Sequence, residues 1–557
     1  MFIISFLELF IKYVIFYIYL YLVGRSLFVV VPYLNKNKIN NKLLYVDSDI
    51  LYPLFGFIIF GNGLFIINTL LPIDSIYVVI FVALLIIPAI TKAKLFSRSL
   101  NLNIKFFLYY LAIPSLLVIS TFDIAFNYDA GYYHLLHQNW LRNSNLIIGM
   151  VNIFWPFGMS SIYEYVSAFL WFDTSFVLLH FINLFFIHFF YLFLGENITA
   201  SKNKYLVNSS LFVLFFSLLD NFGLGGGRNG YIYIQGVTKQ DVTVGILFFF
   251  LALVIFLKIK DSNITNQEIV IISFLLFFIY QIKVSGVLIV YLYLILLINQ
   301  ILKKRHTFID LIKLNFPVLI LATTWILKSI FTTGCLIYPV NITCIEVFDW
   351  YIDGSTKSFE GITKHASLAF DGTLPFLEWI QIAGSFEYRN QVFSNFLVSI
   401  LILIFIKFIL FKKSEIKNSL KFVGLSFIFF SILYLIYFGP IPRYAVGICI
   451  FSASFIGLLS SDRKLKISNN FTFVLLFISV LFLVRSTAYS AFLNNNEFKI
   501  FDPRTNYEIN YEIGFETLSE KWVAPLDADQ CWANIKCTAS KDIIDFREVG
   551  IFKIAYK

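Results

Sequence analysis

The amino-acid sequence predicts an all-α membrane protein that crosses the bilayer about 14 times. Hydrophobic residues make up 59% of the chain and charged residues only 14%, whereas a soluble domain averages about 25% charged residues. Apolar runs of roughly 15 to 22 residues recur, and this is near the length that crosses a bilayer. Lysine and arginine concentrate in the short connectors between these runs, as they do in cytoplasmic loops. The basic residues behind the net charge of +9 therefore serve to set the membrane topology, and we expect no nucleic-acid partner.

The predicted spans follow the apolar runs in order. They lie at residues 2–22, 51–70, 75–92, 105–121, 174–194, 205–220, 241–259, 268–282, 284–301, 312–331, 391–411, 421–438, 442–460 and 468–487. Six basic connectors separate them, among them "KKRHTF" and "SDRKLK", and all six fall on one side if the N-terminus starts outside. We therefore expect these connectors in the cytoplasm and the long loops on the outer side.

The spans divide the chain into six regions. We expect N-terminal transmembrane helices at 1–121, a first large external loop with interfacial amphipathic helices at 122–173, a transmembrane core at 174–331, an external disulfide loop at 332–390, further transmembrane helices at 391–487 and a small extracytoplasmic tail at 488–557. Helices suit this arrangement because lipid offers no partner for free backbone groups.

Four of the five cysteines occur as close pairs in the outer segments. Cys335 and Cys344 would close one short loop, and Cys531 and Cys537 another. Disulfides of this kind belong to an oxidising compartment, and each would add on the order of 2–3 kcal/mol to local stability. A zinc site at the second pair would need further ligands, and no third one stands nearby. Cys449 lies in a predicted span, where we expect it to pack as a small apolar side chain.

The stretch "FNYDAGYYHLLHQNW", residues 126–140, places a carboxylate and two imidazoles next to an apolar run. Tyr133, Leu136 and Trp140 repeat with helical spacing, which predicts an amphipathic helix lying in the membrane interface. Asp129 stands at or just before the start of this helix. It is either a helix cap, because exposed N–H groups favour a carboxylate there, or a functional group. Its position at a membrane boundary favours the functional interpretation.

His134 and His137 are three residues apart and would share one face of that helix. With Asp129 and Asp123 close by, they are candidate ligands of a divalent metal. No HExxH-like motif supports this site, and a carboxylate base acting with bound phosphate needs no metal. We therefore predict no cofactor, with a divalent metal as the alternative.

Five basic residues fall on the predicted outer side, against the topological bias. They are Arg228, Lys239, Lys283, Lys328 and Arg443, and they come from separate segments. Each alone has a structural explanation, because a lysine near a span end reaches toward the interface and an arginine can cap carbonyls. Together they predict a cationic pocket for an anionic group, and a phosphate at the membrane surface is its natural ligand.

Several stretches, taken in order, resemble one group of proteins. They are "YDAGYYHLLHQNW", "NLIIGMVNIFWPFGMSS", "IKVSG", "WILKSIFTTGCLIYP", "GPIPRYAVG" and "CWANIKC". The series resembles bacterial polytopic membrane proteins of surface-polysaccharide assembly, which make O-antigen or capsule and are similar to glycosyltransferases of the GT-C fold. The resemblance extends from the first large external loop to the C-terminal tail.

The resemblance implies transfer of a sugar from a polyprenyl phosphate or pyrophosphate carrier to a glycan acceptor, with membrane lipids around the site. The reaction would take place in the bacterial inner membrane, on the side that faces the periplasm. In such enzymes an acidic residue of the first large external loop is the catalytic base. Asp129 is the matching position and Asp123 the second choice, although many such enzymes have this loop after their first span and this chain has it after the fourth.

The other predicted site residues fall into two groups. The expected ligands of the lipid-linked phosphate are Lys283, Lys328, Arg443 and Arg228. The expected contacts of the sugar or acceptor are Tyr132, Tyr133, His134, His137 and Trp140.

Two other functions are alternatives. A repeat-unit polymerase that joins lipid-linked oligosaccharides would also need a basic outer pocket, and it would depend on arginines, with Arg443 and Arg389 as candidates, rather than on Asp129. A transporter or flippase usually places ionisable residues near the bilayer midplane and often carries an internal repeat. Here the charges gather at one face and the halves do not resemble each other, which favours an enzyme.

Overall fold

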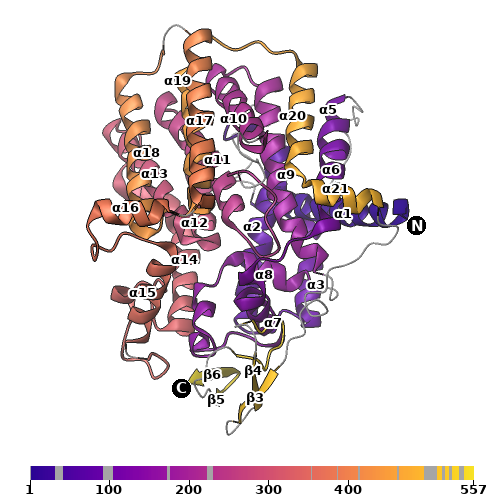
Figure 1. Ribbon diagram of the computed structural model, residues 1–557, viewed down its shortest axis with the longest axis vertical. Coiled ribbons are helices and arrows are strands. Elements are labelled where there is room, and N and C mark those ends of the chain that lie inside the picture. Colours follow the sequence, from indigo (N-terminus) through magenta and orange to yellow (C-terminus); the bar gives the residue numbers. More distant parts are fainter. Residues whose placement is uncertain are drawn as a thin grey trace.

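The computed structural model is almost entirely helical (Figure 1). It describes residues 2–31, 42–91, 104–171, 176–222, 230–352, 354–385, 387–411, 414–460, 463–494, 511–516, 521–525, 530–538 and 545–556. Within these residues ten helices are long and apolar enough to cross a membrane, or eleven if a bent pair counts as one span. The chain therefore has the architecture of a multi-pass membrane protein.

Helices make up most of the chain, and the few strands lie within residues 42–47 and 511–556. The α-helices are α1 (Phe2–Val30), α2 (Ser48–Asn68), α3 (Ile76–Leu84), α4 (Ile87–Thr91), α5 (Ile104–Phe107), α6 (Ile113–Ile119), α7 (Leu135–Asn143), α8 (Ile162–Phe169), α9 (Val177–Ala200), α10 (Lys204–Phe222), α11 (Asp241–Asp261), α12 (Asn266–Ile282), α13 (Ile289–Leu302), α14 (Phe308–Thr333), α15 (Ser355–Ser367), α16 (Phe376–Gly384), α17 (Glu387–Leu410), α18 (Asn418–Phe438), α19 (Val446–Leu459), α20 (Asn469–Leu483) and α21 (Ser486–Asn494). The tighter or wider turns are η2 (Leu108–Ala112), η3 (Ser120–Asp123), η4 (Ala130–His134), η5 (Met150–Asn152), η6 (Trp155–Met159), η7 (Val284–Leu288), η8 (Asn341–Thr343) and η9 (Pro442–Ala445). The strands are β1 (Lys42–Leu43), β2 (Val46–Asp47), β3 (Tyr511–Glu516), β4 (Lys521–Pro525), β5 (Asp545–Val549) and β6 (Phe552–Tyr556).

The ten candidate spans correspond to ten of the predicted runs. They are Phe6–Val30, Ser48–Asn68, Ile104–Asp123, Val177–Ala200, Asp241–Asp261, Val284–Leu302, Phe308–Thr333, Asn390–Leu410, Asn418–Phe438 and Pro442–Leu459. The other predicted spans are helical but short or interrupted: α12 and the α3–α4 segment are short apolar helices, and α20 and α21 meet at 84°. α10 has 19 residues and carries polar side chains along its length, among them Asn208 and Asp220. In the described residues, length and composition thus support ten or eleven spans rather than the predicted fourteen.

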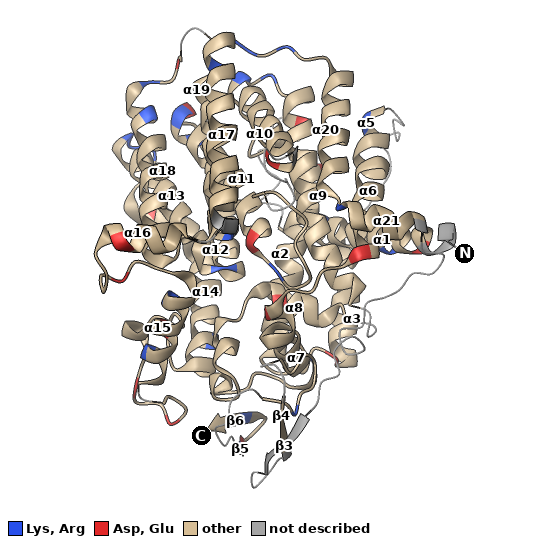
Figure 2. Cartoon of the chain, viewed as in Figure 1, with Lys and Arg blue, Asp and Glu red and all other residues tan. Residues whose placement is uncertain are grey.

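The two ends of the long axis differ in character. At the upper end of Figure 1 lie the connectors from α17 to α18 and from α19 to α20. Lys204 pairs there with Glu415, and Lys464 Nζ donates to the Ser201 carbonyl at 2.8 Å. The lower end holds α7, α8, α15 and strands β3 to β6. Figure 2 shows many of the described lysines and arginines at the upper end, opposite α7, α15 and the strands. Two of the six predicted basic connectors lie largely outside the described residues, at 32–41 and 92–103.

α9 and α11 form the centre of the helical bundle. Their most apolar windows are 94% and 100% buried, whereas those of α14, α17 and α18 are only 17% buried. The exposed side chains of these outer helices are large and apolar, for example Phe316, Leu401 and Phe422. Apolar surface of this extent is favourable against lipid and unfavourable against water. The outer helices therefore form a lipid-facing layer around a protein-packed centre.

The C-terminal segments pack onto α7 as two hairpins. β3 pairs with β4 and β5 with β6, both antiparallel. The apolar face of α7, with Leu136 and Trp140, is buried there beside Trp522. We expected this face to lie in the membrane interface, and the tail covers it instead. An amphipathic pattern shows that a face is apolar, but it does not show whether lipid or protein covers that face.

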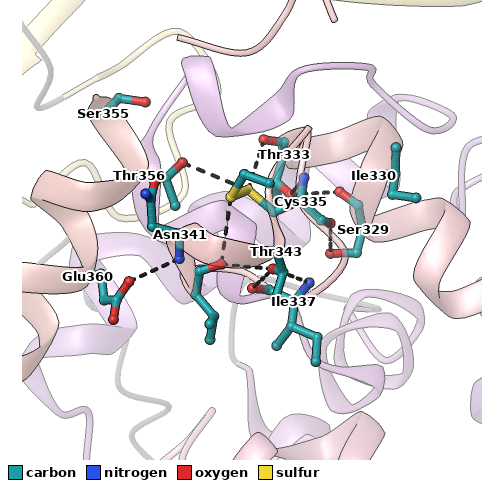
Figure 3. Close-up of a disulfide and its surroundings, with 12 residues drawn as sticks. Ser329, Ile330, Thr333, Cys335, Ile337, Asn341, Thr343, Ser355, Thr356 and Glu360 are labelled. Carbon is teal, nitrogen blue, oxygen red and sulfur yellow. Dashed lines mark hydrogen bonds between the residues drawn. A yellow bond between two sulfur atoms is a disulfide. The ribbon is translucent and has the colours of Figure 1, made fainter. Parts of the chain in front are cut away.

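Both predicted disulfides are present, and the fifth cysteine is buried within α19. The bond between Cys335 and Cys344 closes the loop that follows α14 (Figure 3). Ser329 Oγ donates to the Cys335 carbonyl at 2.9 Å, and Asn341 N donates to Glu360 Oε2 at 2.9 Å. These bonds attach the loop to the end of α14 and to α15, so the last turns of α14 are held firmly.

Two glycines let α1 and α2 approach backbone to backbone. A Cβ at Gly56 would lie 1.8 Å from the Leu20 carbonyl oxygen, and a Cβ at Gly24 would lie 1.8 Å from the Tyr52 carbonyl oxygen. Small residues permit such close contacts between helices in membranes.

We expect Gly56→Ala to destabilise the protein, because the added methyl group meets backbone atoms. Overpacking a tight contact typically costs about 1–3 kcal/mol. Gly61→Ala in the same helix is the matched control, since its Cβ would meet only side chains, the nearest being Ile162 at 3.2 Å. The apparent unfolding temperature of the detergent-solubilised chain should fall clearly for Gly56→Ala and little for Gly61→Ala. Equal unfolding temperatures would contradict this account of the α1–α2 contact.

Candidate functional site

A short pairing between two loops places Asp129. Val237 N donates to the Ala125 carbonyl at 3.0 Å. Gly236 permits this approach, because a Cβ there would lie 2.4 Å from the same carbonyl oxygen. Asp129 follows Ala125 by four residues, Lys239 follows Val237 by two, and the two side chains form an ion pair.

The Asp129–Lys239 pair is partly buried. The Asp129 side chain is 28% exposed and that of Lys239 is 11%. Asp129 directly precedes the helical turn at Ala130, yet it makes no capping hydrogen bond, so the structure does not support the helix-cap interpretation. Burial raises the pKa of Asp129, but the Lys239 ammonium, with smaller effects from His134 and Arg443, more than offsets this and holds the pKa below its usual value. The carboxylate is therefore ionised at neutral pH.

A second ion pair involves the start of α11 and the end of α12. Asp241 is the first residue of α11, and it pairs with Lys283, which follows the last residue of α12. The Asp241 side chain is 2% exposed, and Gln235 Nε2 donates to it at 3.3 Å. Lys283 Nζ also lies 4.4 Å from the centre of the Tyr444 ring. A nearly dry carboxylate is thus compensated by an ammonium and an amide.

Arg443 approaches both pairs from a further segment, η9. Its charge acts on Asp129 and on Asp241, but it forms no direct ion pair with a described residue. Its Nε is buried without a hydrogen-bond partner among the described residues. The cluster holds three cations and two carboxylates, which leaves a net charge of 3 − 2 = +1. An unpaired guanidinium donor with excess positive charge is suited to bind an anion.

A cleft opens beside Arg443. Part of its lining is polar, with Asp241, Ser285, Ser431 and Tyr444, and part is apolar, with Phe248 of α11, Leu435 of α18 and Ile448 of α19. The cleft encloses about 400 Å³, counting its open mouth. A ligand that joins a charged group to a hydrocarbon chain would match both parts of this lining.

Glu164 is the centre of a second polar cluster, which the sequence interpretation missed. The side chain is 2% exposed, and each oxygen accepts one hydrogen bond: Oε1 from His134 Nδ1 at 2.6 Å and Oε2 from His137 Nδ1 at 2.5 Å. Burial raises the pKa of Glu164, but the two histidines more than offset this and hold the pKa well below its usual value. Ser161 and Glu164 also form the capping box of α8. That S-x-x-E pattern is the one local signal that marks this glutamate, and it predicts only a cap.

A π-helical turn positions the histidines. η4 precedes α7, and the Leu135 N–H donates to the Ala130 carbonyl five residues earlier. In this wider turn residues five apart lie one above the other, and His134 accordingly acts electrostatically on Asp129. Single π turns occur frequently at functional sites.

Lys328 belongs to the second cluster. It is 6% exposed, its charge interacts with Glu164, and it lines a separate cavity with His137 and Trp140. It does not line the cleft at Arg443. We predicted that the outer cations meet in one cavity. In the structure Lys328, on α14, lies instead beside α7 and α8, away from the cleft at Arg443.

Asp123 lies apart from both clusters. It accepts a hydrogen bond from Thr487 and lines a third cavity with His180 and Arg485. Thr487 comes just after the break between α20 and α21. Asp123 thus has surroundings of its own, distinct from those of Asp129.

The remaining predicted residues lie around η4 or outside the described part of the chain. Tyr132 packs with the aromatic cluster under the tail, and the Tyr133 ring centre is 4.0 Å from that of His134. Arg228 lies outside the described residues, and so does the side chain of Arg389. The described residues contain no group of three or more His, Cys, Asp or Glu side chains that could hold a metal ion.

We expect Glu164→Gln to destabilise the protein strongly. The neutral amide cannot replace a carboxylate that accepts from two buried imidazoles, and breaking a buried charged pairing typically costs about 3–5 kcal/mol. Glu360→Gln is the matched control, because Glu360 bonds to Asn341 and Lys364 near the surface. The unfolding temperature should fall more for Glu164→Gln than for Glu360→Gln, and the reverse order would refute a central role for this carboxylate.

One family match covers most of the chain, including both clusters. Residues 6–451 match the family model described as Domain of unknown function (DUF8201). Neither the curated proteins nor the solved structures contain a significant match. Since the match spans most of the chain, this protein belongs to the DUF8201 family.

Proposed function

We propose that the chain is a membrane glycosyltransferase of the GT-C type, which transfers a sugar from a polyprenyl-phosphate-type lipid to a glycan acceptor. The observation that carries this proposal is the cleft at Arg443, which Arg443 and Asp241 line together with apolar side chains. Lys283 pairs with Asp241 there, and the Asp129–Lys239 pair lies close enough for the charge of Arg443 to act on Asp129. The surface-polysaccharide proteins that the sequence resembles use a carboxylate and a lipid-linked phosphate for this chemistry.

The cleft is suited to the lipid-linked donor. Arg443 would bind the phosphate, because its Nε is buried and unpaired among the described residues. The apolar side chains of α11, α18 and α19 would contact the first units of the prenyl chain. Lys283 would add a second positive charge, and it is held in place by Asp241.

The proposed reaction is a displacement at the anomeric carbon. The acceptor oxygen bonds to that carbon while its proton passes to the Asp129 carboxylate, which acts as general base. The bond from the anomeric carbon to the phosphate oxygen breaks, and its electron pair stays on the phosphate. Arg443 and Lys283 stabilise the negative charge that develops there. Lys239 keeps the Asp129 carboxylate ionised before the acceptor arrives.

The proposed location is the periplasmic face of a bacterial inner membrane. Two features support it: the connectors rich in lysine and arginine gather at the end opposite the site, and both disulfides lie in segments on the side of the site.

A repeat-unit polymerase is the second candidate, and the unpaired Arg443 Nε favours it as well. Such an enzyme would depend on Arg443 and would tolerate loss of Asp129. Glycan analysis of cells separates the two: a missing sugar on each repeat indicates a transferase, whereas single unpolymerised repeats indicate a polymerase.

We expect Asp129→Asn to lower transfer by at least about 100-fold, since general base catalysis typically contributes 10²–10⁴. Transfer is measured with the reconstituted chain and lipid-linked sugars extracted from the host. Normal turnover of this variant, together with loss of polymerisation in Arg443→Ala, would favour the polymerase instead.

A double variant separates catalysis from folding in this test. Asp129→Asn leaves the buried Lys239 without its carboxylate, which by itself destabilises the loops. Asp129→Asn with Lys239→Met removes both charges, and its unfolding temperature should recover toward that of the wild type. Transfer should remain lost in the double variant, because the base is still absent.

A further inference from the structure

A cavity distinct from the cleft at Arg443 lies between α7, α8 and α14. Lys328, His137 and Trp140 line it, and the loop at 145–150 closes another side. No residue is shared between the lining of this cavity and that of the cleft. The two spaces are therefore separate sites.

Lys328 brings a positive charge to this cavity without an acceptor for its N–H groups among the described residues. Its side chain lies over the Trp325 ring, with Nζ 5.0 Å from the ring centre. Glu164 attracts it, but both oxygens of that carboxylate already accept from His134 and His137. The ammonium thus has a carboxylate nearby, but no described residue accepts a hydrogen bond from it.

A second donor in the lining is also unpaired. Trp140 is 8% exposed, and its Nε1 has no hydrogen-bond partner among the described residues. Lys328 of α14 and Trp140 of α7 therefore line one cavity, and each carries an N–H donor without a hydrogen-bond partner among the described residues. A group with several oxygen acceptors and a negative charge would satisfy both.

We propose that this cavity binds an oxyanion, a carboxylate or phosphate group carried by one sugar unit of the acceptor glycan. Its role as an acceptor site rests on the proposed function, whereas binding of the oxyanion does not. Lys328 and Trp140 would donate to the oxygens of this group. His137, held by Glu164, would form the opposite wall.

The walls of the cavity suit one face of a sugar unit. The rings of Trp140, Phe157 and Tyr165 are part of the lining. Flat apolar rings suit the C–H face of a sugar, and the charged donor then selects an acidic sugar over a neutral one.

The experiment titrates the purified full chain by calorimetry with D-glucuronate, inorganic phosphate and D-glucose. Glucose is the uncharged counterpart of glucuronate. Lys328→Met removes the ammonium, and Lys357→Met makes the same change at an exposed lysine of α15. We expect wild type and Lys357→Met to bind glucuronate or phosphate, Lys328→Met to bind at least about ten-fold more weakly, and glucose not to bind.

The three probes also identify the source of the oxyanion. Binding of glucuronate alone supports a uronic acid, binding of phosphate alone supports a phosphorylated sugar, and binding of both supports a general oxyanion site. Equal affinity in Lys328→Met, equal binding of glucose, or no binding by the wild type would overturn the proposal.

Two further variants guard against a folding defect. Lys328→Arg keeps the charge and should retain binding, and Trp140→Phe removes only the second donor and should weaken binding. The unfolding temperature of each variant is measured without probe. Activity of Asp129→Asn tests the proposed function separately: normal transfer there with intact oxyanion binding rejects the transferase alone, and loss of transfer without oxyanion binding rejects this cavity alone.

Discussion

The compensation of buried charge is the constraint on which the part of the structure around α7, α8 and the starts of α11 and α19 depends. An ionised side chain removed from water is stable only when opposite charge and hydrogen-bond partners surround it. Asp241 meets this requirement through Lys283, Asp129 through Lys239, and Glu164 through two histidines. In each case the partner belongs to a different segment of the chain. The pairings therefore do more than neutralise charge, because they fix the positions of α7, α8, α11 and α12 relative to one another.

The charged side chains of the spans lie at or near the ends of the spans, where irregular backbone is tolerated. Asp241 begins α11, Lys283 follows α12, and Arg443 lies in the turn before α19. Lys328 is close to the end of α14, which the disulfide loop attaches to α15 (Figure 3). A flexible lysine on a frayed helix end would gain little selectivity for a ligand, because ordering it on binding costs entropy. The loop removes part of that cost in advance.

Local patterns in the sequence predicted the local features. The apolar runs located the helices, and the close cysteine pairs located both disulfides. The sequence could not predict partners, because Asp129 and Lys239 are 110 residues apart and no spacing rule links them. Glu164 carries only a capping signal, since the histidines that bond to it lie on another helix. The span count was too high where polar side chains or a bend interrupt apolar segments, as in α10 and at the α20–α21 junction.

The two clusters differ in the binding partners that they lack, and this difference indicates a different role for each at the proposed site. The cluster at Arg443 has one positive charge in excess, so it favours a ligand whose negative charge grows during the reaction, as that of a leaving phosphate does. In the cluster at Lys328 the ammonium lies near the Glu164 carboxylate, and no described residue accepts its hydrogen bonds, so this cluster favours a group that supplies oxygen acceptors and whose charge does not change. Binding of such a group contributes equally to the ground state and the transition state, and it fixes position without stabilising the transition state selectively. Binding of this kind suits an acceptor, because the anionic group of the acceptor takes no part in bond formation. On the proposed function, the donor cluster would therefore set the rate, and the Lys328 cavity would select the glycan that is presented to Asp129.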